Sequence, residues 1–192
     1  SEIIELAKTK KVKYIFRKKK LGIGSAHKLG IKWGKNNNYR YVVTMDCDGT
    51  HDPEHIKKML IKVKIFNIIN TNRFNKKNSL KKWNIIRVMI TCIRHSLVSN
   101  LLDLKFDSSG GFRLYDLKKV KIRDILKAKH NGYSFLWESL FLLKENGYKI
   151  EDIDVDLPRR KLGYSKMKVK DILDGFIYLI KIFILNKLFK RF

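Results

Sequence analysis

Hydrophobic and polar positions alternate along the first half of the chain in a way that predicts helices and strands in turn. Apolar residues three and four positions apart indicate amphipathic helices, and short runs rich in β-branched and aromatic residues indicate buried strands. Helices are predicted at about 1–8, 25–35 and 53–66, and strands at 12–16, 41–45 and 68–74. Helices that alternate with strands favour an α/β fold built on a parallel sheet.

The second half of the chain is richer in helix. Helices are predicted at 83–104, 117–128, 132–145 and 169–188, strands at the end of 107–115 and at 148–157, and a basic loop at 158–168. The last helix has a broad apolar face opposite Asp171, Asp174 and Lys181, and it ends in a basic cluster. Such a helix lies in a membrane interface or closes the core as a final element, and the pattern fits both.

The strand at 41–45 ends in a pair of carboxylates, Asp46 and Asp48, followed by Gly49 and a helix start at Pro53. Open α/β sheets bind their ligands just beyond the carboxyl ends of strands. Two carboxylates can share one hard divalent cation with the oxygens of a diphosphate. Asp and Gly are also common in solvated turns, so the pair alone leaves both interpretations open.

A second candidate anion site lies near the start of the chain. A basic cluster from Arg17 to Lys20 precedes Gly22 and Gly24, and a helix is predicted to follow. Glycines before a helix let backbone amides approach an anion, which the helix dipole also favours. The spacing lacks the third glycine of a dinucleotide-binding fingerprint.

Composition places the chain among proteins that fold and that meet anionic partners. Its 192 residues are 44% hydrophobic, and 43 Lys and Arg against 18 Asp and Glu give a formal net charge of +25. Nucleic acid, an acidic membrane surface and phosphorylated substrates all fit this charge. Cys47 and Cys92 lack the spacing of a disulfide framework or a zinc site. We see no secretory signal and no run of about 18 apolar residues that would span a bilayer.

Seven short motifs occur in order along the chain. They are Arg17 with Lys20-Leu-Gly-Ile-Gly-Ser-Ala26, Met45-Asp-Cys-Asp48 with His51-Asp-Pro53, Asn72-Arg73-Phe74, Trp83 with Arg87 and Thr91, Gly110-Gly-Phe-Arg-Leu-Tyr115, Gly132-Tyr-Ser-Phe-Leu-Trp-Glu138, and Arg160 with Gly163 and Ser165-Lys166. Together they resemble the inverting, family-2 glycosyltransferases of the dolichyl-phosphate mannosyltransferase and polyprenyl-phosphate glycosyltransferase kind.

This resemblance implies a GT-A fold, with a mostly parallel sheet, helices on both faces and a nucleotide-sugar donor such as GDP-mannose or UDP-glucose. Asp46 and Asp48, with Thr50 in the place of a family Gln, would hold Mg²⁺ or Mn²⁺ on the donor diphosphate. The donor side would also include Arg17, Lys20, Gly22 and Gly24.

The acceptor that the resemblance implies is a polyprenyl or dolichyl phosphate. Its phosphate is already ionised and needs charge screening more than a base. The residues that match acceptor-phosphate positions are Arg73, Arg87, Thr91, Arg160, Ser165 and Lys166. The catalytic residues would be Asp48, Arg73, Arg87, Arg160 and Lys166. The lipid acceptor implies a peripheral protein on the cytoplasmic face of a membrane.

We expect a glycosyltransferase domain at 1–168 and an amphipathic membrane-interface helix at 169–192. The family's opening strand and its Asp-Asp-Gly-Ser segment have no counterpart here, so we expect the chain alone to bind donor poorly and to show little transfer. The competing interpretation is a basic module, without catalysis, that binds a membrane or nucleic acid. We favour the enzyme and expect no nucleic-acid partner, because stacking aromatics on an exposed sheet are not evident.

Overall fold

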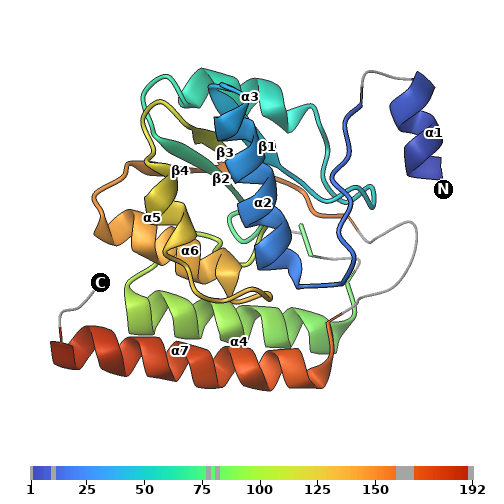
Figure 1. The fold of residues 1–192 in the computed structure, drawn as a ribbon. Coiled ribbons are helices and arrows are strands. Elements are labelled where there is room, and N and C mark those ends of the chain that lie inside the picture. Colours follow the sequence, from blue (N-terminus) through green and yellow to red (C-terminus); the bar gives the residue numbers. More distant parts are fainter. Residues whose placement is uncertain (1, 10–11, 77–78, 81–82, 159–166, 190–192) are drawn as a thin grey trace.

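A four-stranded sheet forms the centre of the molecule (Figure 1). The computed structural model describes residues 2–9, 12–76, 79–80, 83–158 and 167–189. The strands are β1 (Tyr41–Thr44), β2 (Ile68–Asn72), β3 (Arg113–Asp116) and β4 (Ile150–Asp154). Their order across the sheet is β1-β3-β2-β4.

Three of the four strands point the same way. β2 pairs parallel with β4, while β3 lies between β1 and β2 and pairs antiparallel with both. The predicted α/β fold with a mostly parallel sheet is therefore confirmed, with β3 as the one reversed strand. Because β3 runs backwards, it begins where β1 and β2 end, and it brings residues 108–111 to that edge.

Helices cover both faces of the sheet, as predicted. One face packs against α2 (Ile23–Asn36), α5 (Ile122–Leu126) and α6 (Phe135–Glu145), where Ile31, Ile125 and Leu140 are fully buried. The other face packs against α3 (His55–Lys62), where Met59 is fully buried against a smaller apolar cluster. Burial of these apolar side chains is the main favourable contribution to folding.

Two long helices lie side by side beneath the sheet and its covering helices, α4 (Ile85–Leu102) and α7 (Val169–Phe189) (Figure 1). The Tyr178 hydroxyl of α7 donates a hydrogen bond of 2.8 Å to Glu138 of α6. Leu179 and Ile182 are buried, so one stripe of α7 closes the core. The rest of its apolar face stays exposed. The interpretation as a core-closing helix is confirmed for the buried stripe, and the membrane-interface interpretation stays a prediction.

One prediction about a single segment is wrong. Residues 12–16 do not form a strand: they pair with no described strand, and Phe16 is 79% exposed. A run with high β-propensity becomes a strand only when a neighbouring strand and a buried face are present. Among the described residues, α4 is also long and apolar enough to cross a membrane by length and composition. Arg87 and Arg94 interrupt its apolar run, which is why a search for uninterrupted apolar residues missed it.

The other predicted elements are present with shifted ends. The first helix is α1 (Glu2–Thr9), and the helix predicted at 117–128 shortens to α5. The Asp116 carboxylate accepts a hydrogen bond from the Lys118 amide, which turns the chain before that helix can begin.

Candidate active site

A cleft of about 920 Å³ opens where β1 and β2 end, between the sheet and the first turns of α4. The residues from the sequence prediction that line it are Asp46, Asp48, Thr50, Arg73, Arg87 and Thr91. They come from three separate segments of the chain. The fold therefore gathers the predicted carboxylates and two of the predicted arginines around one cavity.

The turn after β1 holds the two aspartates in a fixed arrangement. Thr50 donates two hydrogen bonds to the Asp48 carboxylate, from its amide at 3.1 Å and from its hydroxyl at 2.6 Å. Gly49 has φ of 77°, a left-handed conformation that glycine adopts without strain. The hydroxyl proton of Thr50 is thus directed at Asp48, which orients that carboxylate in the cleft.

His51 is a cleft residue that the sequence prediction did not include. Its Nδ1 atom accepts a hydrogen bond of 2.8 Å from the Asp46 amide, and its ring stacks on Phe112 with centroids 4.9 Å apart. Burial lowers the pKa of His51 and the charge of Arg73 lowers it further, while Asp46 and Asp48 act in the opposite direction. His51 stands in the quoted motif, but only the folded turn shows that it supports the backbone of Asp46.

The two carboxylates suit a divalent cation that also binds phosphate. No group of three or more His, Cys, Asp or Glu side chains that could hold a metal occurs in the part of the chain that the structure describes. Mg²⁺ is commonly bound through one or two carboxylates together with substrate phosphates and water. Asp46 and Asp48 fit that pattern, and the hydroxyl oxygen of Thr50 is the third predicted oxygen ligand.

Arg73 is buried and tied to the edge of the cleft. Its Nε atom donates a hydrogen bond of 2.6 Å to Asp107, and its side chain is 9% exposed. Burial tends to raise the pKa of Asp107, but the Arg73 guanidinium and hydrogen bonds from Ser109 hold it below its ordinary value. The Asp107 carboxylate therefore stays ionised at neutral pH and holds the Arg73 side chain at the edge of the cleft.

The α4 wall of the cleft carries positive charge. Arg87, Thr91 and Arg94 are three and four residues apart, so they lie on one face of the helix. The Nε atom of Arg94 is buried without a hydrogen-bond partner. Burial lowers the pKa of Arg94 to about 10, helped by the neighbouring Arg73 and Arg87, which leaves it charged at neutral pH. The stripe is visible in the sequence, but the place of Arg94 in the cleft is not.

Four predicted donor residues do not line the cleft. Arg17 donates a hydrogen bond of 2.8 Å to the Ser25 hydroxyl, and Lys20 is exposed. Gly22 and Gly24 are explained by packing, since a Cβ at either would lie within 2.5 Å of Asn131 or Phe135. Ile23, between them, does line the cleft. The predicted contact of these four residues with the donor stays a prediction.

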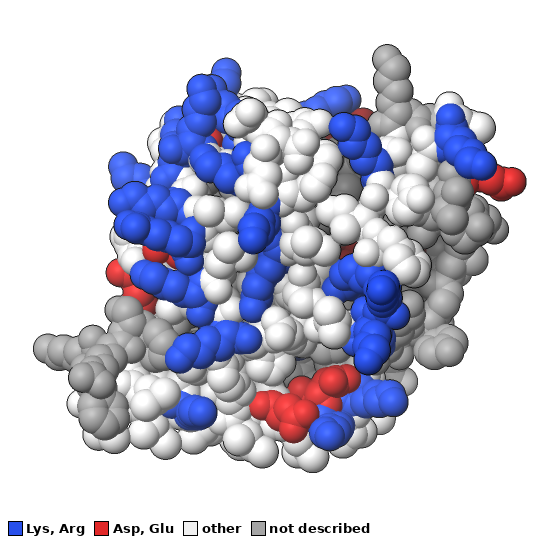
Figure 2. Space-filling view, in the orientation of Figure 1, with Lys and Arg blue, Asp and Glu red and all other residues white. Residues whose placement is uncertain are grey.

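Three predicted acceptor residues, Arg160, Ser165 and Lys166, lie outside the described residues. The segments that flank them reach the cleft, because Leu157 and Met167 line it. Figure 2 shows Lys and Arg side chains spread widely over one face of the molecule, with Asp and Glu in few places. This face of the molecule is therefore basic, as the formal net charge of +25 leads one to expect.

Comparisons with known proteins agree with this geometry. Residues 1–122 match the family described as Glycosyl transferase family 2. The chain is 28% identical over 157 residues to an undecaprenyl-phosphate mannosyltransferase of Micrococcus luteus, covering 81% of this chain and 65% of that protein. It is 25% identical over 174 residues to a polyprenol monophosphomannose synthase of Mycolicibacterium smegmatis, covering 90% of this chain and 66% of that protein. The chain thus spans about two thirds of the length of these curated relatives.

Proposed function

Because the chain belongs to Glycosyl transferase family 2 and its α/β sheet has the arrangement of a GT-A fold, we propose that it moves a hexose from a nucleotide-sugar to a polyprenyl or dolichyl phosphate. The names of the two relatives support this acceptor and favour mannose over glucose. The observation that carries the proposal is a single cleft lined by Asp46 and Asp48 and also by Arg73, Arg87 and Arg94. The two carboxylates suit a metal-bound diphosphate, and the three arginines suit a free phosphate.

Asp46 and Asp48 would hold the donor through Mg²⁺ or Mn²⁺. A bound cation would neutralise charge that develops on the leaving nucleoside diphosphate. Thr50 and His51 would fix the two aspartates before the substrate arrives, through the hydrogen bonds to Asp48 and to the Asp46 amide. Groups held in place beforehand need no reorganisation during the reaction, which is the main source of electrostatic catalysis.

The acceptor phosphate would react as a dianion. One of its oxygens attacks the anomeric carbon, the bond from that carbon to the diphosphate breaks, and the leaving group takes the electron pair. A single displacement of this kind inverts the anomeric centre, and the protein has no proton to remove from the nucleophile. Arg73, Arg87 and Arg94 would screen the repulsion between the acceptor and the donor, both of which are anionic.

The acceptor's tail places the reaction at a bilayer, so we expect the protein to lie peripherally on the cytoplasmic face of a membrane. Apolar side chains on the first turns of α4 and α7 are exposed: Ile85, Ile86, Met89, Ile93, Val169, Leu173, Phe176 and Ile177. Two adjacent helices with such surfaces suit the bilayer interface. A bilayer-spanning α4 would instead place Arg87 and Arg94 in hydrocarbon, which is costly.

Sugar transfer into lipid tests the proposal. The protein, expressed from its complete reading frame, is incubated with Mg²⁺ or Mn²⁺, liposomes containing polyprenyl phosphate, and labelled GDP-mannose or UDP-glucose. We expect label in the organic phase with one donor, loss of that label in Asp48→Asn, and normal transfer in Glu54→Gln, which removes an exposed carboxylate outside the cleft. Label that stays in the aqueous phase with every donor would overturn the proposal.

A further inference from the structure

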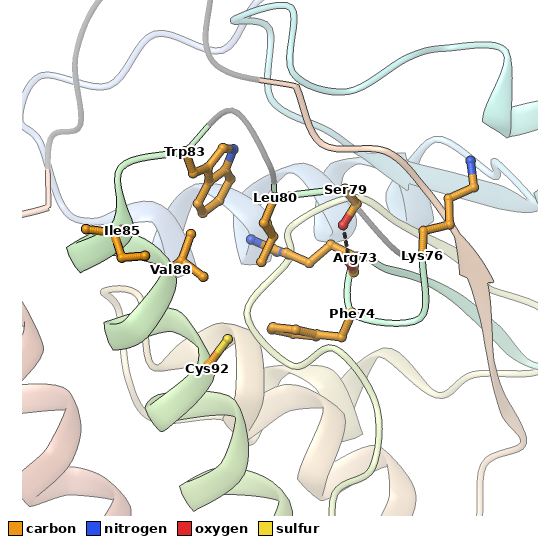
Figure 3. Close-up of a pocket in the computed structure, with 9 residues that line it drawn as sticks. All are labelled: Arg73, Phe74, Lys76, Ser79, Leu80, Trp83, Ile85, Val88 and Cys92. Carbon is orange, nitrogen blue, oxygen red and sulfur yellow. Dashed lines mark hydrogen bonds between the residues drawn. The ribbon is translucent and has the colours of Figure 1, made fainter.

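A second cavity, of about 440 Å³, lies beside the cleft (Figure 3). It is bordered by described residues between Arg73 and Trp83, which follow β2, and by the first turns of α4. Its lining is mostly apolar, with Phe74, Leu80, Trp83, Ile85, Val88 and Cys92. The Ser79 hydroxyl donates a hydrogen bond to the Arg73 carbonyl, which holds the β2 segment against this cavity. Nothing in the catalytic proposal so far uses this space.

The cavity adjoins the catalytic cleft through two shared residues, Arg73 and Trp83. The Arg87 guanidinium lies over the Trp83 ring, 3.8 Å from its centroid, and the Arg73 guanidinium lies 5.9 Å from it. The indole nitrogen donates a hydrogen bond of 3.1 Å to the Leu157 carbonyl, which fixes the ring. The Trp83 ring therefore lies beside two guanidinium groups and also borders the apolar cavity.

We propose that this cavity binds the isoprene units nearest the phosphate of the lipid acceptor, an inference that rests on the proposed function. At Arg73 and Trp83, which line both cavities, the lining changes from the charged residues of the cleft to the apolar residues of the small cavity. A prenyl phosphate has the same sequence of properties, because its dianionic head is bonded directly to a branched hydrocarbon. A nucleotide does not, since a polar ribose follows its phosphates.

The surface beyond the cavity supports this choice of ligand. Ile85, which lines the cavity, is 72% exposed, and Met89 on the next turn of α4 is 57% exposed. A tail that leaves the cavity at this end would meet the exposed apolar side chains of α4, which are also the side chains proposed to face the bilayer. A prenyl chain could then pass from the cleft to the membrane along apolar contacts.

The two cysteines of the chain supply a direct test, because each lines one cavity. Cys92 lines the small cavity and Cys47 lines the cleft, and both are exposed. Alkylation of the two thiols is followed by peptide mass mapping with farnesyl phosphate, farnesol or inorganic phosphate present. We expect farnesyl phosphate to slow alkylation of Cys92 by about tenfold, since thiol reactivity follows exposure. Inorganic phosphate should leave Cys92 reactive, and farnesol should protect it only weakly because it lacks the charged head.

A matched pair of variants tests the cavity during turnover. Cys92→Phe fills the cavity, whereas Ser96→Phe places the same ring one turn further along α4, at an exposed serine that lines neither cavity. We expect Cys92→Phe to raise KM for the prenyl phosphate by about tenfold, the discrimination typical of an apolar pocket. KM for the nucleotide-sugar should be unchanged, and Ser96→Phe should behave as wild type.

The outcomes separate this inference from the proposed function. If sugar is transferred while farnesyl phosphate leaves Cys92 reactive, the cavity does not bind the tail. Equal effects of Cys92→Phe and Ser96→Phe would also overturn the inference, because they would indicate a general effect of a bulky ring on α4. If Cys92 is protected but no donor supports transfer, the cavity binds prenyl phosphate and the proposed reaction is wrong.

Discussion

The two walls of the cleft are built in different ways. The wall that follows β1 is short, polar and tied to itself: Thr50 bonds to Asp48, His51 bonds to the Asp46 amide, and Thr50 and His51 are 9% and 8% exposed. The α4 wall combines arginines with exposed apolar residues, with Ile86 63% and Ile90 40% exposed. Hydrogen bonds within the turn fix the first wall, whereas the second wall leaves the buried Nε of Arg94 without a partner.

This difference indicates what each wall is for. A fixed polar turn suits a soluble ligand whose phosphates must meet a cation in one geometry. A wall that is charged toward the cleft and apolar toward solvent suits an amphiphile, whose head and tail need different surroundings. Each wall can therefore be changed without changing the other, and so can the helix α7 that packs beside α4.

Removing one charge from the β1 wall should have the largest effect. Asp48→Asn keeps the size of the side chain and can still accept the hydrogen bonds from Thr50, but it is no longer an anionic ligand. We expect transfer to fall by about 10²-fold or more, the scale of losing one key electrostatic group. Initial rates across a Mn²⁺ titration measure this. An unchanged rate with unchanged metal dependence would mean that Asp48 is not a ligand.

The packing behind the β1 wall should make stability depend on pH. His27 of α2 lies against Gly111, whose carbonyl accepts the Thr44 hydroxyl proton at 2.6 Å, and its ring meets Phe135 edge-on. Burial lowers the pKa of His27 from 6.5 to about 4, helped by Arg113 and then by His51. Between pH 6.5 and 4 the unfolded chain binds the proton and the folded chain does not, so stability falls as pH falls through this window.

The contribution of His27 can be isolated by substitution. At pH 5 the lowered pKa corresponds to a loss of about 2 kcal/mol relative to pH 8. Urea unfolding of wild type and His27→Gln at the two pH values measures the difference, and the variant should lose about that much less. Equal losses in the two proteins would assign the pH dependence to other groups.

On the α4 wall, Arg94 should matter mainly to the acceptor. Arg94→Lys keeps the charge but replaces the planar guanidinium, which can donate two parallel hydrogen bonds to phosphate, with a compact ammonium group. We therefore expect KM for the lipid phosphate to rise about tenfold. KM for the donor and the metal titration should stay constant. Arg123→Lys, at an exposed arginine of α5 that does not line the cleft, is the matched control. An equal rise in both KM values would show that Arg94 supports the cleft as a whole.

The sequence was a good guide where the chemistry is local. Asp46, Asp48 and Thr50 stand together after one strand, so their place in one cleft follows once that strand is recognised. Arg73 likewise follows β2 directly. Arg87 and Thr91 share a helix face by spacing alone, and the fold confirms that this face lines the cleft.

Features that depend on distant contacts could not be predicted. Gly24 is explained by Phe135, more than a hundred positions away in the chain, and no local pattern contains that contact. The strand predicted at 12–16 fails for a similar reason, because pairing depends on what lies beside it. Glu138 is a buried carboxylate in an apolar helix, and its partners, two backbone amides and the Tyr178 hydroxyl, come from other segments of the chain.

The smallest predicted effect concerns α7, whose two sides are as different as the two walls of the cleft. Removing the helix after Lys170 would also remove Leu179 and Ile182 from the core, so single substitutions separate its roles better. Ile177 is 66% exposed, and we expect Ile177→Ser to weaken binding to anionic liposomes by about 1 kcal/mol, or fivefold, without changing the unfolding midpoint. Ile182→Ser, at a position that is 3% exposed, should instead lower the unfolding midpoint. Asp174→Asn, an exposed polar change on the same helix, should not weaken liposome binding.

Sedimentation with liposomes and urea unfolding measure the two properties separately. Liposome binding of Ile177→Ser equal to that of wild type would mean that the exposed side of α7 does not contact lipid, which would leave the surface of α4 to hold the protein at the membrane.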